Sequence, residues 1–229
     1  MTNQINNVSS ILTVAQVNDM FIYVGEKVIE AKAWLTDIDC AIGDGDHGIG
    51  MEVGFKHALE KLKANNYDKI NDVFAEIGKA MIGNMGGASG VLFGTLFLSG
   101  VKGLEKIEQL DVAILGTIFG NGLLGVQSRG KAEVGDKTMI DALSPAVDAL
   151  REANKNQLGL VATFTNATKA AKQGVENSKA LVAKFGRAKS LGERAIGHQD
   201  AGATTISIIF ESMQNYVVEL ENKGELLNA

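Results

Sequence analysis

The chain of 229 residues has one cysteine, Cys40, and one proline, Pro145. A single cysteine excludes an internal disulfide, so nothing in the chain requires an oxidising compartment, and we expect a cytoplasmic protein. The N-terminal residues carry neither a basic segment nor an apolar run, so we expect no secretion signal. Because proline falls far below its usual share of about 5%, turn-rich β folds are disfavoured and long helices are favoured.

Clustered positive charge and long apolar spans are also lacking. Lys and Arg number 22 against 27 Asp and Glu, giving a net charge of −5, and no basic stripe is present to neutralise a phosphate backbone. Residues 80–101 and 112–128 contain no charged side chain, but glycines interrupt both, and the second is only about five turns long. We interpret both as buried helices, and we expect no nucleic-acid partner and no membrane segment.

Apolar residues recur at three- and four-residue steps along most of the chain, which predicts amphipathic helices. No linker, repeat or shift in composition divides them. We therefore expect one all-α domain over residues 1–229, with residues 1–12 as a flexible N-terminal extension. Ser144-Pro145 either begins one helix or kinks it. The eight expected helices cover residues 13–36, 51–63, 72–85, 88–102, 111–128, 139–153, 157–184 and 202–222.

The segment after the first expected helix is unusually acidic. Residues 33–55 contain no Lys or Arg, and four glycines fall within residues 43–50, where they let the backbone turn tightly. Carboxylates brought together in this way repel one another unless a cation or a proton intervenes. Oxygen ligands of this kind select Mg²⁺, Mn²⁺ or Ca²⁺. The alternative interpretation is a solvated acidic loop. The acidic residues are Asp37, Asp39, Asp44, Asp46 and Glu52.

Three further segments carry polar or glycine-rich patterns. Residues 86–90 precede an apolar run, so backbone N–H groups and the Ser89 hydroxyl are placed to bind an anion, although glycines four residues apart are also typical of a helix-packing face. Residues 135–139 form either a loop beside a ligand or a plain interhelical turn. In residues 186–203, arginines are candidate phosphate ligands or surface ion-pair partners, and Asp200 is also a candidate helix N-cap.

Taken in order, four motifs resemble the nucleotide-binding L subunits of bacterial dihydroxyacetone kinases. The motifs are DCAIGDGDHGIGM at 39–51, GGASGVLFG at 86–94, GDKTMIDALSPA at 135–146 and GRAKSLGERAIGHQDAGA at 186–203. The resemblance implies a closed barrel of eight antiparallel helices whose loops at one end hold ADP or ATP and two Mg²⁺ ions.

The resemblance also implies roles for individual residues. Asp39, Asp44 and Asp46 are expected to bind the two magnesium ions. The residues expected to contact the nucleotide are His47, Gly48, Ile49, Gly50, Ala88, Ser89, Gly130, Met139, Arg187, Asp200, Ala201 and Gly202. The chain departs from the family pattern at Ala88, where Ser or Thr is common, and at Ala201, where Pro is common, so the tightness of nucleotide retention is open.

The implied function is one step of a phosphoryl relay. A phosphohistidine protein of the phosphotransferase system would phosphorylate bound ADP, and the phosphoryl group would pass to dihydroxyacetone held on a separate substrate-binding subunit. Two alternatives stay open: a kinase subunit that uses freely exchanging ATP on another small keto-sugar, and a nucleotide-loaded regulatory binding protein. A homodimer is also compatible with this interpretation.

Overall fold

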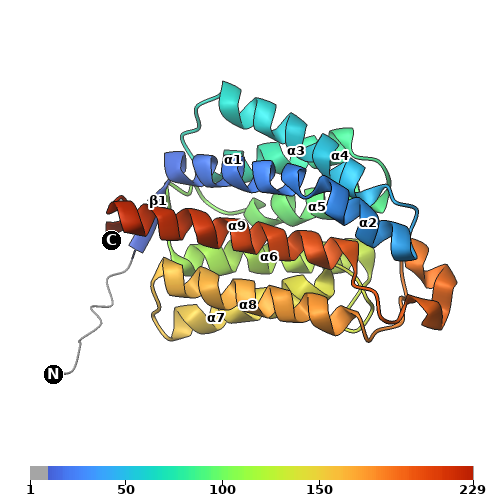
Figure 1. Ribbon diagram of the computed structural model, residues 1–229. Coiled ribbons are helices and arrows are strands. Elements are labelled where there is room, and N and C mark those ends of the chain that lie inside the picture. The colour runs from blue at the N-terminus through green and yellow to red at the C-terminus, as the bar shows by residue number, and fades with distance from the viewer. Residues whose placement is uncertain (1–9, 229) are drawn as a thin grey trace.

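The computed structural model describes residues 10–228, which are mainly helical (Figure 1). The α-helices are α1 (Val14–Glu30), α2 (Lys32–Ile42), α3 (His47–Ala64), α4 (Ile70–Asn84), α5 (Gly87–Val101), α6 (Val112–Gly130), α7 (Ile140–Lys155), α8 (Leu160–Ser178) and α9 (Ala201–Lys223). A 3₁₀-helix, η1 (Arg187–Ala195), precedes α9, and the short strands are β1 (Ser10–Thr13), β2 (Gln109–Leu110) and β3 (Leu227–Asn228). No helix in this described part is long and apolar enough to cross a bilayer. The predicted all-α class is confirmed.

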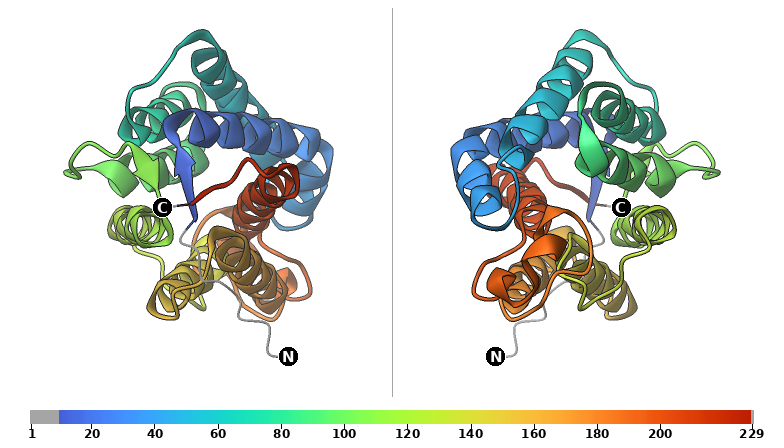
Figure 2. Two further views of the ribbon diagram at one scale, coloured as in Figure 1. Left: turned by 90° about the vertical axis from the view of Figure 1, so that its left-hand side faces the viewer. Right: turned by 90° about the vertical axis from the view of Figure 1, so that its right-hand side faces the viewer.

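The helices pack in a closed order around a shared core (Figure 2). From α3 to α9 each α-helix packs on the next, α9 packs on α1, and α1 packs on α3. Phenylalanines fill the space between them: Phe21 meets Phe74 edge-on at 4.8 Å between ring centroids, and Phe119 lies 5.0 Å from Phe210. Such pairs combine large apolar burial with favourable ring geometry. The eight-helix barrel itself stays a prediction.

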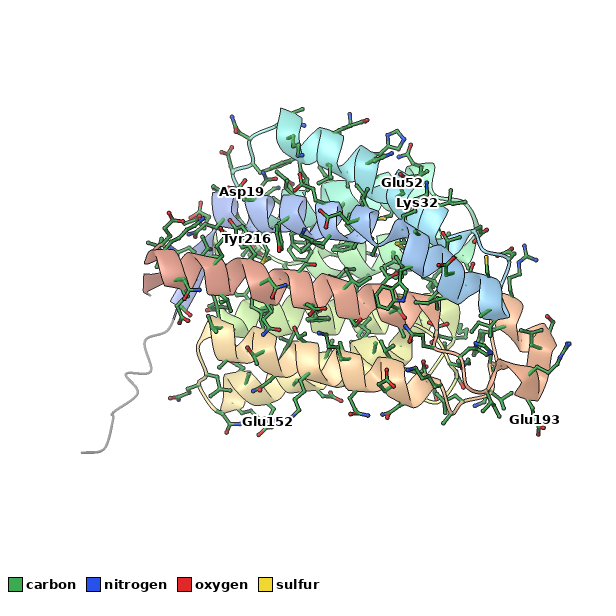
Figure 3. The ribbon with its side chains drawn as sticks, viewed as in Figure 1. Asp19, Lys32, Glu52, Glu152, Glu193 and Tyr216 are labelled. Carbon is green, nitrogen blue, oxygen red and sulfur yellow. The ribbon has the colours of Figure 1, made fainter. Side chains whose placement is uncertain are left out.

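The first expected helix, residues 13–36, is in fact two helices. Thr13 and Gln16 form a capping box that begins α1, and α1 ends at Glu30, so that α2 starts in a new direction and continues to Ile42. This break places Lys32 on α2 beside Glu52 on α3, with 2.6 Å between Nζ and Oε2 (Figure 3). Neither glycine nor proline marks the break in the sequence, which is why the helical periodicity did not reveal it.

A small antiparallel sheet joins both ends of the described chain, in the order β2-β1-β3. Residues 10–12, which we expected to be flexible, form most of β1. Ile11 and Leu12 are buried there, and the Ser10 hydroxyl accepts a hydrogen bond of 3.0 Å from the Leu160 amide. Cross-strand pairing and apolar burial therefore order this segment. Residues 1–9, the rest of the expected extension, lie outside the described residues.

Pro145 lies inside α7, so the interpretation of Ser144-Pro145 as a helix start is wrong. Because proline has no N–H, the Asp141 carbonyl loses its usual partner four residues on. Gly174 of α8 packs directly against that carbonyl, since a Cβ at Gly174 would stand 2.1 Å from the Asp141 oxygen. The helix expected at 157–184 ends at Ser178, and the chain from there to α9 forms a connection that contains η1.

Candidate functional site

A cavity of about 730 Å³ opens at the end of the molecule where α2 ends and α3 and α9 begin. In Figure 1 this is the right-hand end, where η1 also lies, and the sheet lies at the opposite end. The walls come from six separate parts of the chain, all of them helix termini or the loops beside them. A cavity of this size suits a small ligand of nucleotide dimensions.

Three carboxylates converge on one wall of the cavity. Asp39 lies in the last turn of α2, and Asp44 and Asp46 lie in the loop before α3; one oxygen from each falls within 4.8 Å of the others. Gly45 between them has φ +74°, a conformation that glycine adopts without strain. The Arg187 side chain, 2.8 Å from Asp44 between Nε and Oδ2, contributes positive charge. Desolvation and the charges of Asp44 and Asp39 raise the pKa of Asp46.

His47 is buried at the start of α3, and both of its ring nitrogens have partners. Nε2 lies 2.8 Å from the Thr205 hydroxyl, and Nδ1 lies 3.3 Å from the Ser89 hydroxyl. Thr205 donates its own proton to the Ala201 carbonyl, so we assign the imidazole proton to Nε2 and the acceptor role to Nδ1. Burial lowers the pKa of His47 to about 4, although Asp39 acts in the opposite direction. His47 is therefore neutral at physiological pH.

The glycines at the start of α5 serve two different purposes. Gly86 and Gly87 line the cavity, and no atom lies within 4 Å of where a Cβ would stand, so the backbone there is open to a ligand. Gly90 and Gly94 instead pack on α4, where a Cβ would stand 2.7 Å from the Met85 carbonyl and 2.8 Å from the Gly78 carbonyl, respectively. Gly90 and Gly94 therefore serve helix packing, and the anion site at Gly86, Gly87 and Ser89 stays a prediction.

Two further acids, the buried Asp141 and the half-buried Asp200, shape the loops before α7 and α9 beside the cavity. Asp141 accepts hydrogen bonds from the backbone amides of Gly135 at 2.6 Å and Thr138 at 2.7 Å, and so holds the loop before α7. Asp200 caps α9 by accepting from the Ala203 amide at 2.7 Å, and it also lines the cavity. Burial raises the pKa of Asp200 to about 7, while its bond from Ala203 lowers it.

The structure brings most of the predicted residues together. Those that line the cavity are Asp39, Asp44, Asp46, His47, Ala88, Ser89, Gly130, Met139, Arg187, Asp200, Ala201 and Gly202. Gly48, Ile49 and Gly50 are not among the lining residues. Gly48 packs on the α2 backbone, Ile49 is exposed, and Gly50 faces Met85. They form the first turn of α3, which begins four residues earlier than expected.

The cavity also has walls that our site assignment missed. Ten of the twelve unassigned lining residues fall within the quoted motifs, so a signal existed for them, while Arg129 and Phe185 lie outside the motifs. The ten are Ile42, Gly86, Gly87, Val91, Leu92, Phe93, Lys137, Thr138, Gly186 and Ala188. The apolar residues among them look like core residues in the sequence.

The model of one protein family, described as the DAK2 domain, matches residues 41–215. The chain belongs to the DAK2 domain family. Among curated relatives, this DAK2 domain is 36% identical over 202 residues to the "PEP-dependent dihydroxyacetone kinase, ADP-binding subunit DhaL" of Escherichia coli K12, covering 88% of this chain and 96% of the relative. It is 40% identical over 189 residues to the corresponding subunit of kinase 1 in Listeria innocua, covering 82% and 89%. The resemblance inferred from the four motifs is confirmed.

Solved structures give the same result for the fold of this DAK2 domain. The dihydroxyacetone kinase of C. freundii in complex with AMP-PNP and Mg²⁺ superposes with a TM-score of 0.67 at 26% identity. The match covers 94% of this chain but 36% of that one, so the chain spans about a third of the length of the solved kinase.

Proposed function

We propose that this chain is the ADP-binding subunit of a phosphoenolpyruvate-dependent dihydroxyacetone kinase. The observation that carries the proposal is the convergence of three carboxylates in a cavity of nucleotide size, in a chain that aligns with almost the whole of a subunit bearing that name. The chain alone would be part of the enzyme. A substrate-binding subunit would hold dihydroxyacetone, and a phosphohistidine protein would supply the phosphoryl group.

The carboxylates of the cavity suit Mg²⁺, and the proposal places two such ions between them and the diphosphate. Asp39, Asp44 and Asp46 offer oxygen ligands, which Mg²⁺ prefers, and Mg²⁺ commonly completes its coordination with phosphate oxygens. Without a cation these carboxylates repel one another, with Arg187 as compensation for Asp44. When bound, the metal would neutralise charge that develops on the transferring phosphoryl group.

The protein's own groups would bind and orient the phosphates. The open backbone at Gly86 and Gly87 and the start of α5 present N–H groups that favour an anion. His47 holds the Ser89 hydroxyl in place beside them. Both nitrogens of His47 are occupied and its pKa is about 4, so His47 is poorly suited to carry the phosphoryl group itself.

A kinase with freely exchanging ATP is the second candidate. Two erythrulose kinases of Mycolicibacterium smegmatis are each 30% identical to this chain, which covers 33% and 35% of their lengths. Ala88 and Ala201 line the cavity without the hydroxyl or the rigid ring common in the family, which would loosen nucleotide retention.

Retained nucleotide distinguishes these functions. Native mass spectrometry of the purified chain should show ADP with two Mg²⁺, and Asp44→Ala should abolish magnesium-dependent ADP retention while leaving the helical circular dichroism intact. Asp148→Ala, on the exposed side of α7, serves as the matched control. An Asp44→Ala protein that retains ADP as the wild type does would refute the site.

Reconstitution then separates the donors. With a substrate-binding subunit present, turnover should require the phosphohistidine protein. Excess ATP should not substitute for that protein. Turnover with ATP alone would favour the exchanging kinase, and nucleotide binding without turnover under either condition would favour a regulatory protein. Sedimentation of the same samples tests whether the chain forms a homodimer.

A further inference from the structure

Lys137 is a buried charged side chain in the cavity wall that the proposed function leaves without a role. It is 2% exposed, and its backbone φ of 57° is unusual for a residue with a side chain. Its ammonium donates to the carbonyl oxygen of Ser178 at 2.6 Å and to that of His198. These acceptors lie 41 and 61 residues away along the chain.

The two hydrogen bonds of the Lys137 ammonium group connect three separate segments of the chain. Lys137 belongs to the loop before α7, Ser178 ends α8, and His198 belongs to the connection before α9. The Ser178 hydroxyl also accepts from the Asp200 amide at 3.1 Å, and the Gly197 amide donates to the Lys179 carbonyl at 2.7 Å. The ammonium group therefore lies where these three segments meet.

Burying an ammonium group is unfavourable unless its donors are satisfied, and an apolar side chain would fill the same space without that cost. Desolvation lowers the pKa of Lys137, and the facing carboxylates of Asp200 and Asp141 raise it. A methionine would fill the space of the Lys137 side chain equally well. The lysine at this position therefore contributes its charge and its hydrogen bonds rather than its packing. One acceptor, the His198 carbonyl, lies two residues before the cavity-lining Asp200, and the other belongs to Ser178, whose hydroxyl accepts from the Asp200 amide.

Two of the segments that Lys137 connects, the loop before α7 and the connection before α9, form one side of the cavity. Met139 follows Lys137 by two residues, and Gly202 follows His198 by four. A Cβ at Gly202 would stand 3.3 Å from the Met139 Cβ, so the two segments touch where both line the cavity. Movement of either segment would change the shape of this wall, while the three carboxylates belong to α2 and the loop before α3.

We propose that Lys137 is a positioning residue for the nucleoside part of the nucleotide, acting through the two carbonyl groups that it binds. The inference rests on the proposed function, because it assumes that this cavity takes ADP with Mg²⁺. Lys137 fixes the positions of Met139 and Asp200–Gly202 in the cavity wall. The carboxylate cluster holds the metal and the diphosphate independently of Lys137.

Comparing two ligands tests this division. Magnesium pyrophosphate reproduces the diphosphate, and MgADP adds the nucleoside. In calorimetric titrations, Lys137→Met should weaken MgADP binding about tenfold, as expected for the loss of charge-assisted hydrogen bonds that shape the wall. Magnesium pyrophosphate binding should stay within about twofold of wild type. Hydrogen exchange should accelerate in residues 179–186 and 196–200 and stay unchanged in α1.

Lys184→Met is the matched control. Lys184 lies on the connection after α8 and pairs with Asp136 in the loop before α7 at 2.6 Å, but its side chain is 66% exposed. It should leave both affinities unchanged. If Lys137→Met does not fold, Lys137→Gln, which retains an N–H donor on a shorter side chain, replaces it with the same expected direction.

The outcomes are distinct. Equal weakening of MgADP and magnesium pyrophosphate, or no weakening of either, would overturn the role of Lys137. If the wild-type protein binds neither ligand, the proposed function itself is wrong.

Discussion

Gly48 controls the geometry of the metal site although it does not line the cavity. A Cβ at Gly48 would stand 2.2 Å from the Lys32 carbonyl and 2.8 Å from the Thr36 amide nitrogen, both in the α2 backbone. Ordinary contact begins at 3.4 Å, so Gly48→Ala must separate α2 from the start of α3 by about 1 Å. Asp39 moves with α2 and Asp46 stays with α3, so the carboxylates should no longer converge.

The size of the effect follows from this separation. Mg²⁺ demands near-ideal octahedral geometry, and disturbing the groups that support metal ligands costs between about 10- and 100-fold in affinity. We expect Gly48→Ala to weaken MgADP binding by that factor. Overpacking costs about 1–3 kcal/mol, and alanine regains about 1 kcal/mol of helix propensity, so the loss of stability should be about 1 kcal/mol.

Titration calorimetry with MgADP and thermal unfolding measure both quantities. Gly116→Ala is the control, because no atom lies within 4 Å of its Cβ position and it lies toward the end of α6 remote from the cavity. It should bind MgADP as the wild type does and gain stability. A Gly48→Ala protein with wild-type affinity would refute the reasoning.

Two further predictions concern the buried His47. The pKa of His47 in the folded protein is about 4, below the ordinary value of 6.5. Between pH 4 and pH 6.5 the unfolded chain therefore binds more protons than the folded chain, and the free energy of unfolding decreases as the pH falls through this range. Between pH 7 and pH 5 the wild type should lose about 2 kcal/mol of unfolding free energy relative to His47→Gln in denaturant titrations; parallel pH profiles would contradict this. Thr205→Val should leave the His47 Nε2–H without its acceptor and weaken MgADP binding about tenfold, with recovery in Thr205→Ser. ¹⁵N spectra of the imidazole check the tautomer, and a wild-type Nδ1–H form would contradict the assignment.

The sequence predicted the helical class and the convergence of the acidic segment well, because both depend on local patterns. Periodic apolar residues identified the long helices, and charge repulsion among Asp39, Asp44 and Asp46 indicated a cation site before their geometry was known. The four motifs indicated which distant loops should meet, and twelve of the fifteen predicted site residues do line one cavity.

The remaining features depend on packing between segments, which leaves little local signal. The division of residues 13–36 into α1 and α2 accompanies the close approach of α2 to Gly48 and has no breaker residue of its own. The early start of α3 places Ile49 and Gly50 away from the cavity lining. Lys137 looks like an ordinary loop lysine until the folded chain brings Ser178 and His198 to its ammonium group.

The central claim is that three carboxylates hold divalent metal against a diphosphate. The most direct measurement is anomalous diffraction from crystals grown with Mn²⁺ and ADP, since Mn²⁺ accepts the same oxygen ligands as Mg²⁺ and is visible at its absorption edge. We predict anomalous peaks at about 2.2 Å from oxygens of Asp39, Asp44 and Asp46, with the ADP phosphates on the opposite side of the metal. Bound ADP with no metal peak among these three side chains would contradict the account.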